Sequence, residues 1–131
     1  MTLVHVAVGV VVRGNKVFIS LRPGTAHQGG KWEFPGGKVD EAESVIQALA
    51  RELHEEIGIV VRASEPLLVI EHDYKDKQVK LDVHLVTEFE GEPYGKENQQ
   101  TRWLDIQDLQ ADEFPAANVA IIDALRTTRA E

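Results

Sequence analysis

Hydrophobic residues follow two different repeats along this 131-residue chain, and these repeats predict a mixture of strands and helices. Residues 3–12 are almost continuously apolar and rich in valine, which is typical of a buried strand. The Gly14-Asn15 turn signal and the apolar segment 16–21 predict a second strand, which forms a hairpin with the first. Residues 79–89 alternate between apolar and polar side chains, which indicates a strand with one buried face.

Two segments have the three-to-four-residue spacing of amphipathic helices. In the first, Ser44 and Gln47 have the spacing of a capping box, and Gly58 is a stop signal. Its apolar stripe is expected at Val45, Ile46, Leu49, Leu53 and Ile57. The second helix is expected over 118–126, with its apolar stripe at Val119, Ile122 and Leu125.

The remaining extended segments are short. They are expected at 32–34, 59–61, 67–72 and 101–104, and a helical turn is expected at 105–109. No linker, repeat or low-complexity segment divides the chain, so residues 1–131 are expected to form one domain. The order of strands and helices predicts an α/β fold in which a mixed β-sheet is sandwiched between α-helices (α/β/α).

Composition limits the classes of function that fit this chain. Its hydrophobic content of 43% is ordinary for a globular domain, and the absence of cysteine excludes a disulfide scaffold and thiolate catalysis. The apolar start has no basic leader or small-residue cleavage site, and Arg13 and Lys16 interrupt it. Neither a signal peptide nor a bilayer span is therefore predicted, and we expect a cytoplasmic protein with no membrane partner.

The formal net charge of -8 narrows the partners further. Long nucleic acids bind basic surfaces, so no nucleic acid polymer is expected as a partner, and an acidic protein needs metal ions to act on a polyphosphate. Glu52, Glu55 and Glu56 fall within an arc of about 100° on the first helix. Their repulsion destabilises the helix, and the face is then either simply solvated or a place for a hard divalent cation.

The segment around these glutamates has a fixed order of residue types. It runs Gly37, five residues, Glu43, seven residues, Arg51-Glu52-Leu53, one residue, Glu55-Glu56, one residue and Gly58-Ile59. This order resembles the Nudix box, and every signature position is filled. The resemblance implies the Nudix fold and a hydrolase of nucleoside diphosphates linked to another group. It also implies Mg²⁺ as the cofactor, with Mn²⁺ as a substitute.

Roles for single residues are carried over from the same resemblance. The implied metal ligands are Glu52, Glu55, Glu56 and the backbone carbonyl of Gly36. Glu43 would support the loop and the arginine, and Arg51 would orient the carboxylates. The general base stays open between Glu52 and Glu97, and Glu97 would otherwise be a metal ligand.

Segments outside the box are similar to the MutT-type 8-oxo-dGTP diphosphatases of the Nudix family. They are Arg22 with Ala26-His27, Glu33 to Lys38, Glu90 to Pro93, Gly95 to Glu97, and Ala111 to Pro115 with Ala117-Asn118. The resemblance implies hydrolysis of 8-oxo-dGTP to 8-oxo-dGMP and pyrophosphate, which sanitises the nucleotide pool. Asn118 would read the purine, because an amide both donates and accepts. A backbone carbonyl near Phe34 would accept the hydrogen that the lesion carries on N7.

The other substrate-binding residues that the resemblance implies are Arg22, His27, Phe34, Lys38 and Lys77. Each could also be an ordinary surface or core residue. Asn118 could equally cap the last helix. Lys77 stands where MutT-type enzymes have an arginine, so the charge is kept and planar bidentate contact is lost.

Other functions remain open at the level of the sequence. Tyr74, in the same turn as Lys77, is compatible with a dinucleoside polyphosphate as substrate, and dCTP or CTP is a further alternative. A non-catalytic Nudix-like binding module would be expected to lack ligands in the box, and here none is missing. The expected partner is thus a small nucleotide, and a monomer is expected because no exposed apolar face is evident.

Overall fold

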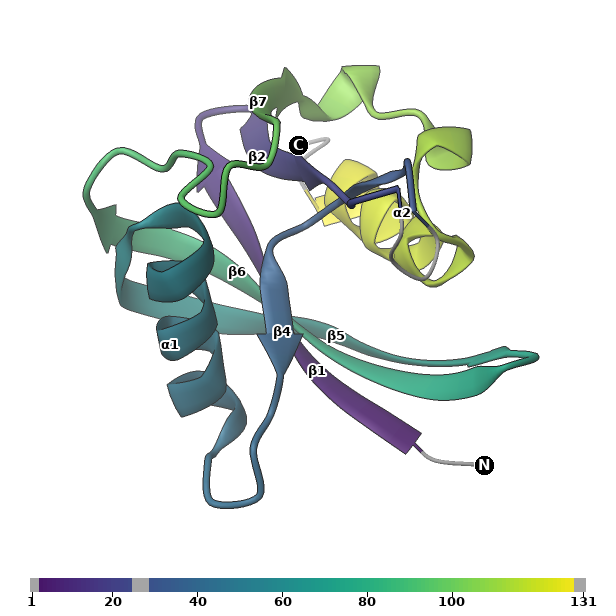
Figure 1. Cartoon of the computed structure of the whole chain (residues 1–131). Coiled ribbons are helices and arrows are strands. Elements are labelled where there is room, and N and C mark those ends of the chain that lie inside the picture. Colours follow the sequence, from purple (N-terminus) through teal and green to yellow (C-terminus); the bar gives the residue numbers. More distant parts are fainter. Residues whose placement is uncertain (1–2, 25–28, 129–131) are drawn as a thin grey trace.

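The computed structural model describes residues 3–24 and 29–128, and these form a mixed sheet with a helix on either side. The strands are β1 (Leu3–Arg13), β2 (Lys16–Leu21), β3 (Trp32–Glu33), β4 (Gly36–Lys38), β5 (Val60–Tyr74), β6 (Lys77–Glu90) and β7 (Thr101–Asp105). The helices are α1 (Val45–Ile57) and α2 (Val119–Thr128), with 3₁₀ turns η1 (Ile106–Asp108), η2 (Ala111–Glu113) and η3 (Ala116–Asn118). Helices α1 and α2 lie on opposite sides of the strands, which confirms the predicted α/β/α arrangement (Figure 1).

Strand β1 is the centre of the sheet. The strand order is β3-β2-β1-β6-β5, with β4 also paired to β1 and β7 to β2. The β1–β6 pair is parallel and the other pairs are antiparallel. The predicted hairpin of β1 and β2 is present, but its pairing is confined to Val12 with Val17 and Arg13 with Lys16. Beyond these pairs β2 continues with β7 and β3.

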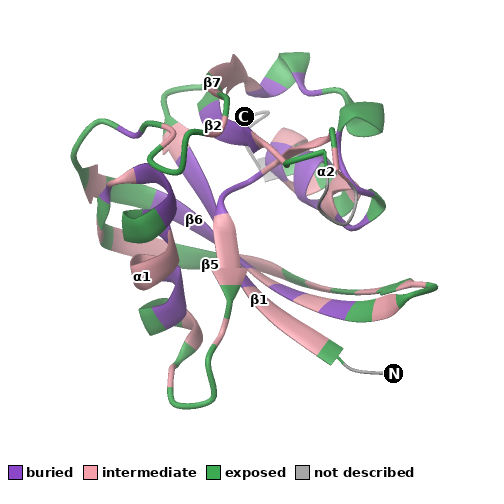
Figure 2. Cartoon of the chain, in the orientation of Figure 1, coloured by how far each residue is buried: buried purple, intermediate pink, exposed green. Residues whose placement is uncertain are grey.

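The two faces of β1 belong to two separate cores, and buried residues gather on the strands between the helices (Figure 2). Ala7 and Val11 pack with α1, in a core that also contains Leu49 and Leu53. Val8 and Val10 face the other way, into a larger core under α2. A strand buried on both faces has no polar side to alternate with, which explains the nearly continuous run of valines.

Helix α1 has the ends that the sequence predicts. The Ser44 hydroxyl accepts from the Gln47 amide at 3.1 Å, and the Ser44 amide donates to the Gln47 side chain at 2.9 Å. Gly58 ends the helix with a left-handed φ of 74°. One position of the predicted stripe is wrong, because Ile46 lies in the first turn and is 49% exposed, whereas Ala48 is buried.

Strand pairing adds one short strand and merges two of the expected ones. Residues Gly36–Lys38, which no expected strand covers, form β4, in which Gly36 pairs with Val8 and Gly37 with Ala7. A Cβ at Gly36 would overlap the Ala7 carbonyl, so a glycine is what allows this close approach. The segments 59–61 and 67–72 are largely parts of a single strand, because register shifts around Ala63 and Pro66 carry β5 past the proline.

The last helix also differs in detail from its prediction. Ile121 is buried together with Ile122 and Leu125, and Val119 is only half-buried. Asn118 is the last residue of η3 and directly precedes the first residue of α2. Within the described residues no helix is long and apolar enough to cross a bilayer.

Candidate active site

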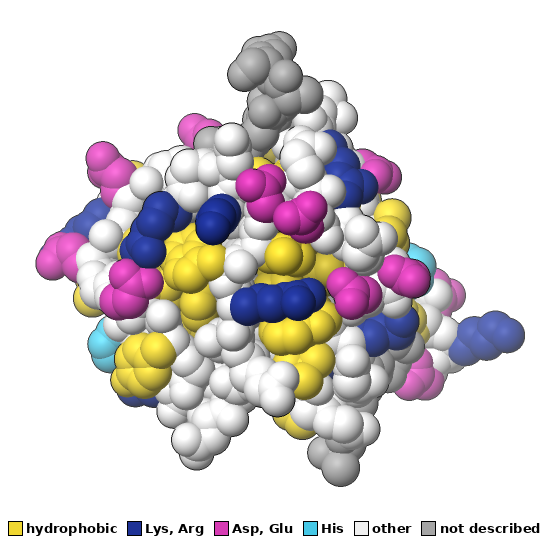
Figure 3. Space-filling view, turned by 90° about the horizontal axis from the view of Figure 1, so that it is seen from above, with side chains coloured by type: hydrophobic (Ala, Val, Ile, Leu, Met, Phe, Trp, Pro, Cys, Tyr) yellow, Lys and Arg dark blue, Asp and Glu magenta, His cyan; other side chains and the backbone are white. Residues whose placement is uncertain are grey.

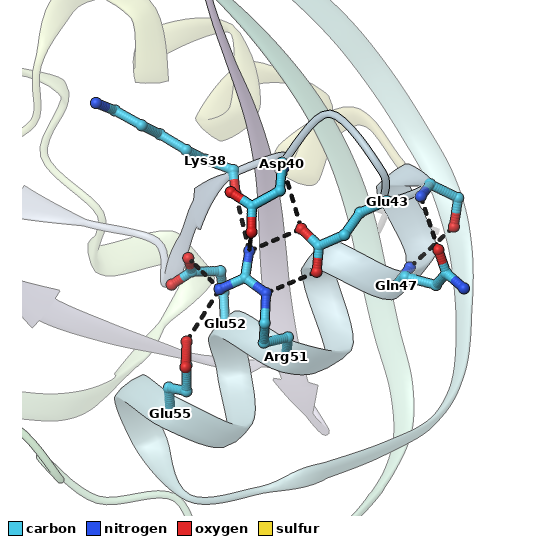
Figure 4. A network of polar contacts seen from close by, with 8 residues as sticks. Lys38, Asp40, Glu43, Gln47, Arg51, Glu52 and Glu55 are labelled. Atoms are coloured by element: carbon cyan, nitrogen blue, oxygen red, sulfur yellow. Dashed lines mark hydrogen bonds and ion pairs between the residues drawn. The ribbon is translucent and has the colours of Figure 1, made fainter.

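Arg51 organises the carboxylates along the outer face of α1 (Figure 4). Its Nε and Nη2 donate to the two oxygens of Glu43 at 2.6 and 2.8 Å. Its Nη1 donates to both Glu52 at 2.9 Å and Glu55 at 3.0 Å, and Nη2 also donates to the Lys38 carbonyl at 3.1 Å. The hydrogen bonds from Arg51 lower the pKa of Glu43 to about 2. One guanidinium thus joins the loop before α1, the end of β4 and two glutamates of the helix.

Glu56 points the other way, into the protein. Its carboxylate accepts from the Gly36 amide at 3.2 Å and from the Ser20 hydroxyl at 3.5 Å. Burial raises the pKa of Glu56 to about 8. Further repulsion comes from the carboxylates of Glu33, Glu97 and Glu52. The site therefore contains a buried acid whose ionised form lacks sufficient positive charge around it.

The three helix glutamates are consequently in two arrangements. Glu52 and Glu55 share the Arg51 guanidinium, whereas Glu56 is turned to Gly36. Over residues 3–24 and 29–128, no three His, Asp or Glu side chains are gathered as a ready-made ion site. An ion held by all three carboxylates would therefore require Glu56 to be brought together with Glu52 and Glu55.

Gly37 determines where the Glu52 carboxylate lies. A Cβ at position 37 would overlap the carboxyl carbon and both carboxyl oxygens of Glu52. The Glu52 side chain is 22% exposed, so its carboxylate lies against the β4 backbone and still reaches solvent. The absence of a side chain at Gly37 thus creates the space that Glu52 occupies.

The loop between β6 and β7 brings Glu97 to the same region. The Gln99 side chain accepts from the Glu97 amide and donates to the Glu56 carbonyl, both at 2.9 Å. The Lys96 amide also donates to the Glu56 carbonyl at 3.2 Å. These contacts hold the exposed Glu97 near the end of α1, where its charge acts on Glu56 and Glu33.

A pocket of about 220 Å³ lies on the α2 side of the sheet and shares β4 with the carboxylates. The candidate substrate residues that line it are Arg22, Phe34, Lys38, Lys77 and Asn118, together with Gly36. The Phe34 ring stacks on Phe114 with the ring centroids 5.4 Å apart. Every described residue predicted to bind substrate therefore contributes to one pocket. His27 lies outside the described residues.

Glu33 is part of the site and was not singled out from the sequence. Its carboxylate accepts from Arg22 Nη1 at 2.6 Å inside the pocket, and burial raises its pKa. The signal in the sequence was its place in the segment Glu33 to Lys38, which resembles MutT-type enzymes. Gln99 was also not predicted, because no sequence pattern in a polar loop indicates that one side-chain amide hydrogen-bonds two backbone groups.

Charges of both signs surround hydrophobic groups on the face seen in Figure 3. Two arginines lie against aromatic rings, with Arg13 4.6 Å from the Trp103 ring centroid and Arg102 4.4 Å from that of Trp32. Arg13 also donates to Glu92 at 3.1 Å. These arginines are therefore engaged by rings and carboxylates of the protein itself.

Comparisons of the sequence and of the structure with known proteins identify the same family. A model of the NUDIX domain matches residues 7–124. The chain is 39% identical to the 8-oxo-dGTP diphosphatase of Escherichia coli (strain K12) over 127 residues, covering 96% of this chain and 98% of that protein. It is 30% identical to the CTP pyrophosphohydrolase of the same strain, covering 99% of this chain and 96% of that protein.

Solved structures match this fold over almost the whole chain. A MutT structure from work on Aliivibrio salmonicida and Vibrio cholerae has a TM-score of 0.82 at 38% identity, covering 97% of this chain and 99% of that one. The Escherichia coli ORF135 protein has a TM-score of 0.86 at 30% identity, with coverages of 99% and 93%. The shared fold, the family match over residues 7–124 and the intact box show that this chain belongs to the Nudix hydrolase family.

Proposed function

We propose that this protein hydrolyses 8-oxo-dGTP to 8-oxo-dGMP and pyrophosphate in a metal-dependent reaction. The observation that carries the proposal is the position of β4 between the pocket and the carboxylates. Gly36 and Gly37 line the pocket, and the same two residues contact Glu56 and Glu52. A nucleotide with its base near Asn118 would place its phosphates along β4 beside the glutamates. The similarity to the Escherichia coli 8-oxo-dGTP diphosphatase supports this choice of substrate.

The carboxylates around β4 fit a hard divalent cation. Burial and the surrounding carboxylates raise the pKa of Glu56, and a cation would offset both effects by stabilising the ionised form. Carboxylate and carbonyl oxygens are also the donors that Mg²⁺ prefers. We therefore assign Mg²⁺, with Mn²⁺ as a substitute, to Glu52, Glu55, Glu56, Glu97 and the Gly36 carbonyl. When bound, the metal neutralises phosphate charge and lowers the pKa of a water molecule.

The protein's own residues supply positioning, which is most of what phosphoryl chemistry requires. Arg51 holds Glu52 against β4, and Glu43 holds Arg51. The attacking water needs a carboxylate to accept its proton, and Glu52 and Glu97 are the two candidates. In the pocket, the Asn118 amide would pair with the base, and Arg22 and Lys77 would face the nucleotide.

A second candidate substrate is CTP or dCTP. The similarity to the CTP pyrophosphohydrolase covers nearly all of the chain. Lys77 also lines the pocket in place of an arginine, so that wall of the pocket differs from MutT-type enzymes.

Turnover of a nucleotide panel tests the proposed substrate. With Mg²⁺, kcat/KM for 8-oxo-dGTP should exceed that for dGTP by roughly three orders of magnitude, because a pocket that hydrogen-bonds the altered edge leaves polar groups unpaired with guanine. The panel should include dCTP, CTP and diadenosine polyphosphates. A higher kcat/KM for any of these three would overturn the assignment to 8-oxo-dGTP.

Replacing Glu52 by glutamine tests the catalytic role of the helix. We expect kcat to fall by roughly 10²- to 10⁴-fold, because a metal ligand or proton acceptor is lost while shape is kept. Glu41→Gln makes the same charge change at an exposed residue of the neighbouring loop and should behave like the parent. Parent-like turnover by Glu52→Gln would show that the catalytic role lies elsewhere.

Gly37→Ala tests the position of the Glu52 carboxylate rather than its charge. The added methyl group would displace that carboxylate, so kcat should fall by roughly 10²-fold. Thermal stability should change little, because the displaced group is the end of a flexible side chain. Gly24→Ala is the control, since its Cβ would meet no atom within 4 Å. Unchanged kcat in Gly37→Ala would mean that Glu52 acts equally well from another position.

The raised pKa of Glu56 predicts how pH and metal affect stability. Between its ordinary pKa of 4.5 and about 8, the folded protein keeps a proton that the unfolded chain has released. The free energy of unfolding of the metal-free protein should therefore fall by about 2–4 kcal/mol as pH rises through this window. Added Mg²⁺ binds the ionised form and should stabilise the protein more at pH 8 than at pH 5.

Urea denaturation of the parent and of Glu56→Gln, with EDTA and with Mg²⁺, measures this dependence. The glutamine variant has no proton to release at position 56, so its metal-free stability should vary less with pH. Identical pH profiles for the two proteins would contradict the prediction.

A further inference from the structure

We propose that Tyr74 is a positioning residue for base recognition, because its hydroxyl anchors η3 and thereby places Asn118 in the pocket. Tyr74 would act through Asn118 and need not touch the base itself. The proposal rests on the proposed function, in which Asn118 pairs with the base of a nucleotide.

The anchor is a hydrogen bond between segments that are distant in sequence. The Ala117 amide donates to the Tyr74 hydroxyl oxygen at 2.9 Å, across 43 positions of the chain. Ala117 is buried and directly precedes Asn118. Tyr74 and Asn118 both line the pocket. The bond therefore joins the tip of the β5–β6 hairpin to the wall of the pocket that carries Asn118.

Turn η3 depends on such an outside contact for its position. The first amides of a helical turn have no acceptor within the turn, and a side chain before the turn usually supplies one. Here the preceding residue is Pro115, which makes no side-chain cap. The tyrosine hydroxyl supplies the acceptor from another strand. Within the turn, the Asn118 amide donates to the Pro115 carbonyl at 2.9 Å. Fixing Ala117 therefore limits where the adjoining Asn118 side chain can lie.

The hairpin end of this anchor is itself held in place. Tyr74 pairs with Lys77 as the last residue pair before the turn. The Tyr74 ring lies 4.5 Å from the His72 ring, centroid to centroid, and packs against the core under α2. The hydroxyl therefore projects from a ring that is already positioned, and little ordering is needed when the bond forms.

Tyr74→Phe tests the hydroxyl apart from the ring, because phenylalanine keeps the ring and removes only the hydroxyl group. We expect KM for 8-oxo-dGTP to rise roughly 3- to 10-fold with kcat nearly unchanged, and the preference over dGTP to fall by a similar factor. Tyr94→Phe is the matched control, since Tyr94 is 53% exposed and lies beside Gly58 at the end of α1. It should retain the parent KM.

A double-mutant cycle with Asn118→Ala tests whether Tyr74 acts through Asn118. In the Asn118→Ala background, Tyr74→Phe should have no further effect on KM or on base preference. An equal effect in both backgrounds would overturn the proposal, because Tyr74 would then act independently of Asn118. So would an unchanged KM in Tyr74→Phe alone.

A measurement without substrate separates this inference from the proposed function. Amide hydrogen exchange in the full chain should be faster at Ala117 in Tyr74→Phe than in the parent, while Tyr94→Phe leaves it unchanged. Unchanged exchange at Ala117 would overturn the inference whatever the substrate is. If the parent prefers another nucleotide, the proposed function fails, and the cycle on that nucleotide still decides the role of Tyr74.

Discussion

Repulsion among carboxylates is the constraint on which the rest of this structure depends. Glu52, Glu55 and Glu56 project from neighbouring turns of α1, and Glu33 and Glu97 approach from other elements. Arg51 offsets part of this repulsion by holding Glu52 and Glu55. Among the described residues no arginine or lysine pairs with Glu56, whose buried carboxyl group has a raised pKa. A protein that only needed to be stable would gain from removing these charges, so their arrangement is best understood as preparation for a cation.

The glycines of β4 allow the carboxylates and the pocket to be adjacent. Gly36 lets this strand pair closely with β1, and Gly37 leaves room for the Glu52 carboxylate. The same strand forms part of the pocket that contains Phe34 and Asn118. Two glycines thus bring the group that would bind a base within one strand of the groups that would bind a metal. A Cβ at Gly36 would overlap the Ala7 carbonyl, and a Cβ at Gly37 would overlap the Glu52 carboxylate.

Much of the site could be predicted because its chemistry is local in the sequence. Arg51 and the glutamates at positions 52, 55 and 56 lie within α1, whose start the capping box of Ser44 and Gln47 marks, and in a helix a spacing of three or four residues already implies a shared face. The residues outside this helix were harder to predict from the sequence. Asn118 was found through resemblance alone, while the roles of Glu33 and Gln99 appeared only when distant segments were seen together.

The sequence by itself determined the order of the elements, the ends of α1 and the family, because turn signals, caps and the Nudix box act over short distances. Only the tertiary structure decided that Ile46 is exposed, that Gly36 and Gly37 form a strand, and that Glu56 turns inward while Glu52 turns to Arg51. These outcomes depend on which backbone lies opposite each residue. Pairing between segments far apart in the chain decides which backbone lies opposite a residue, and no local sequence pattern encodes this pairing.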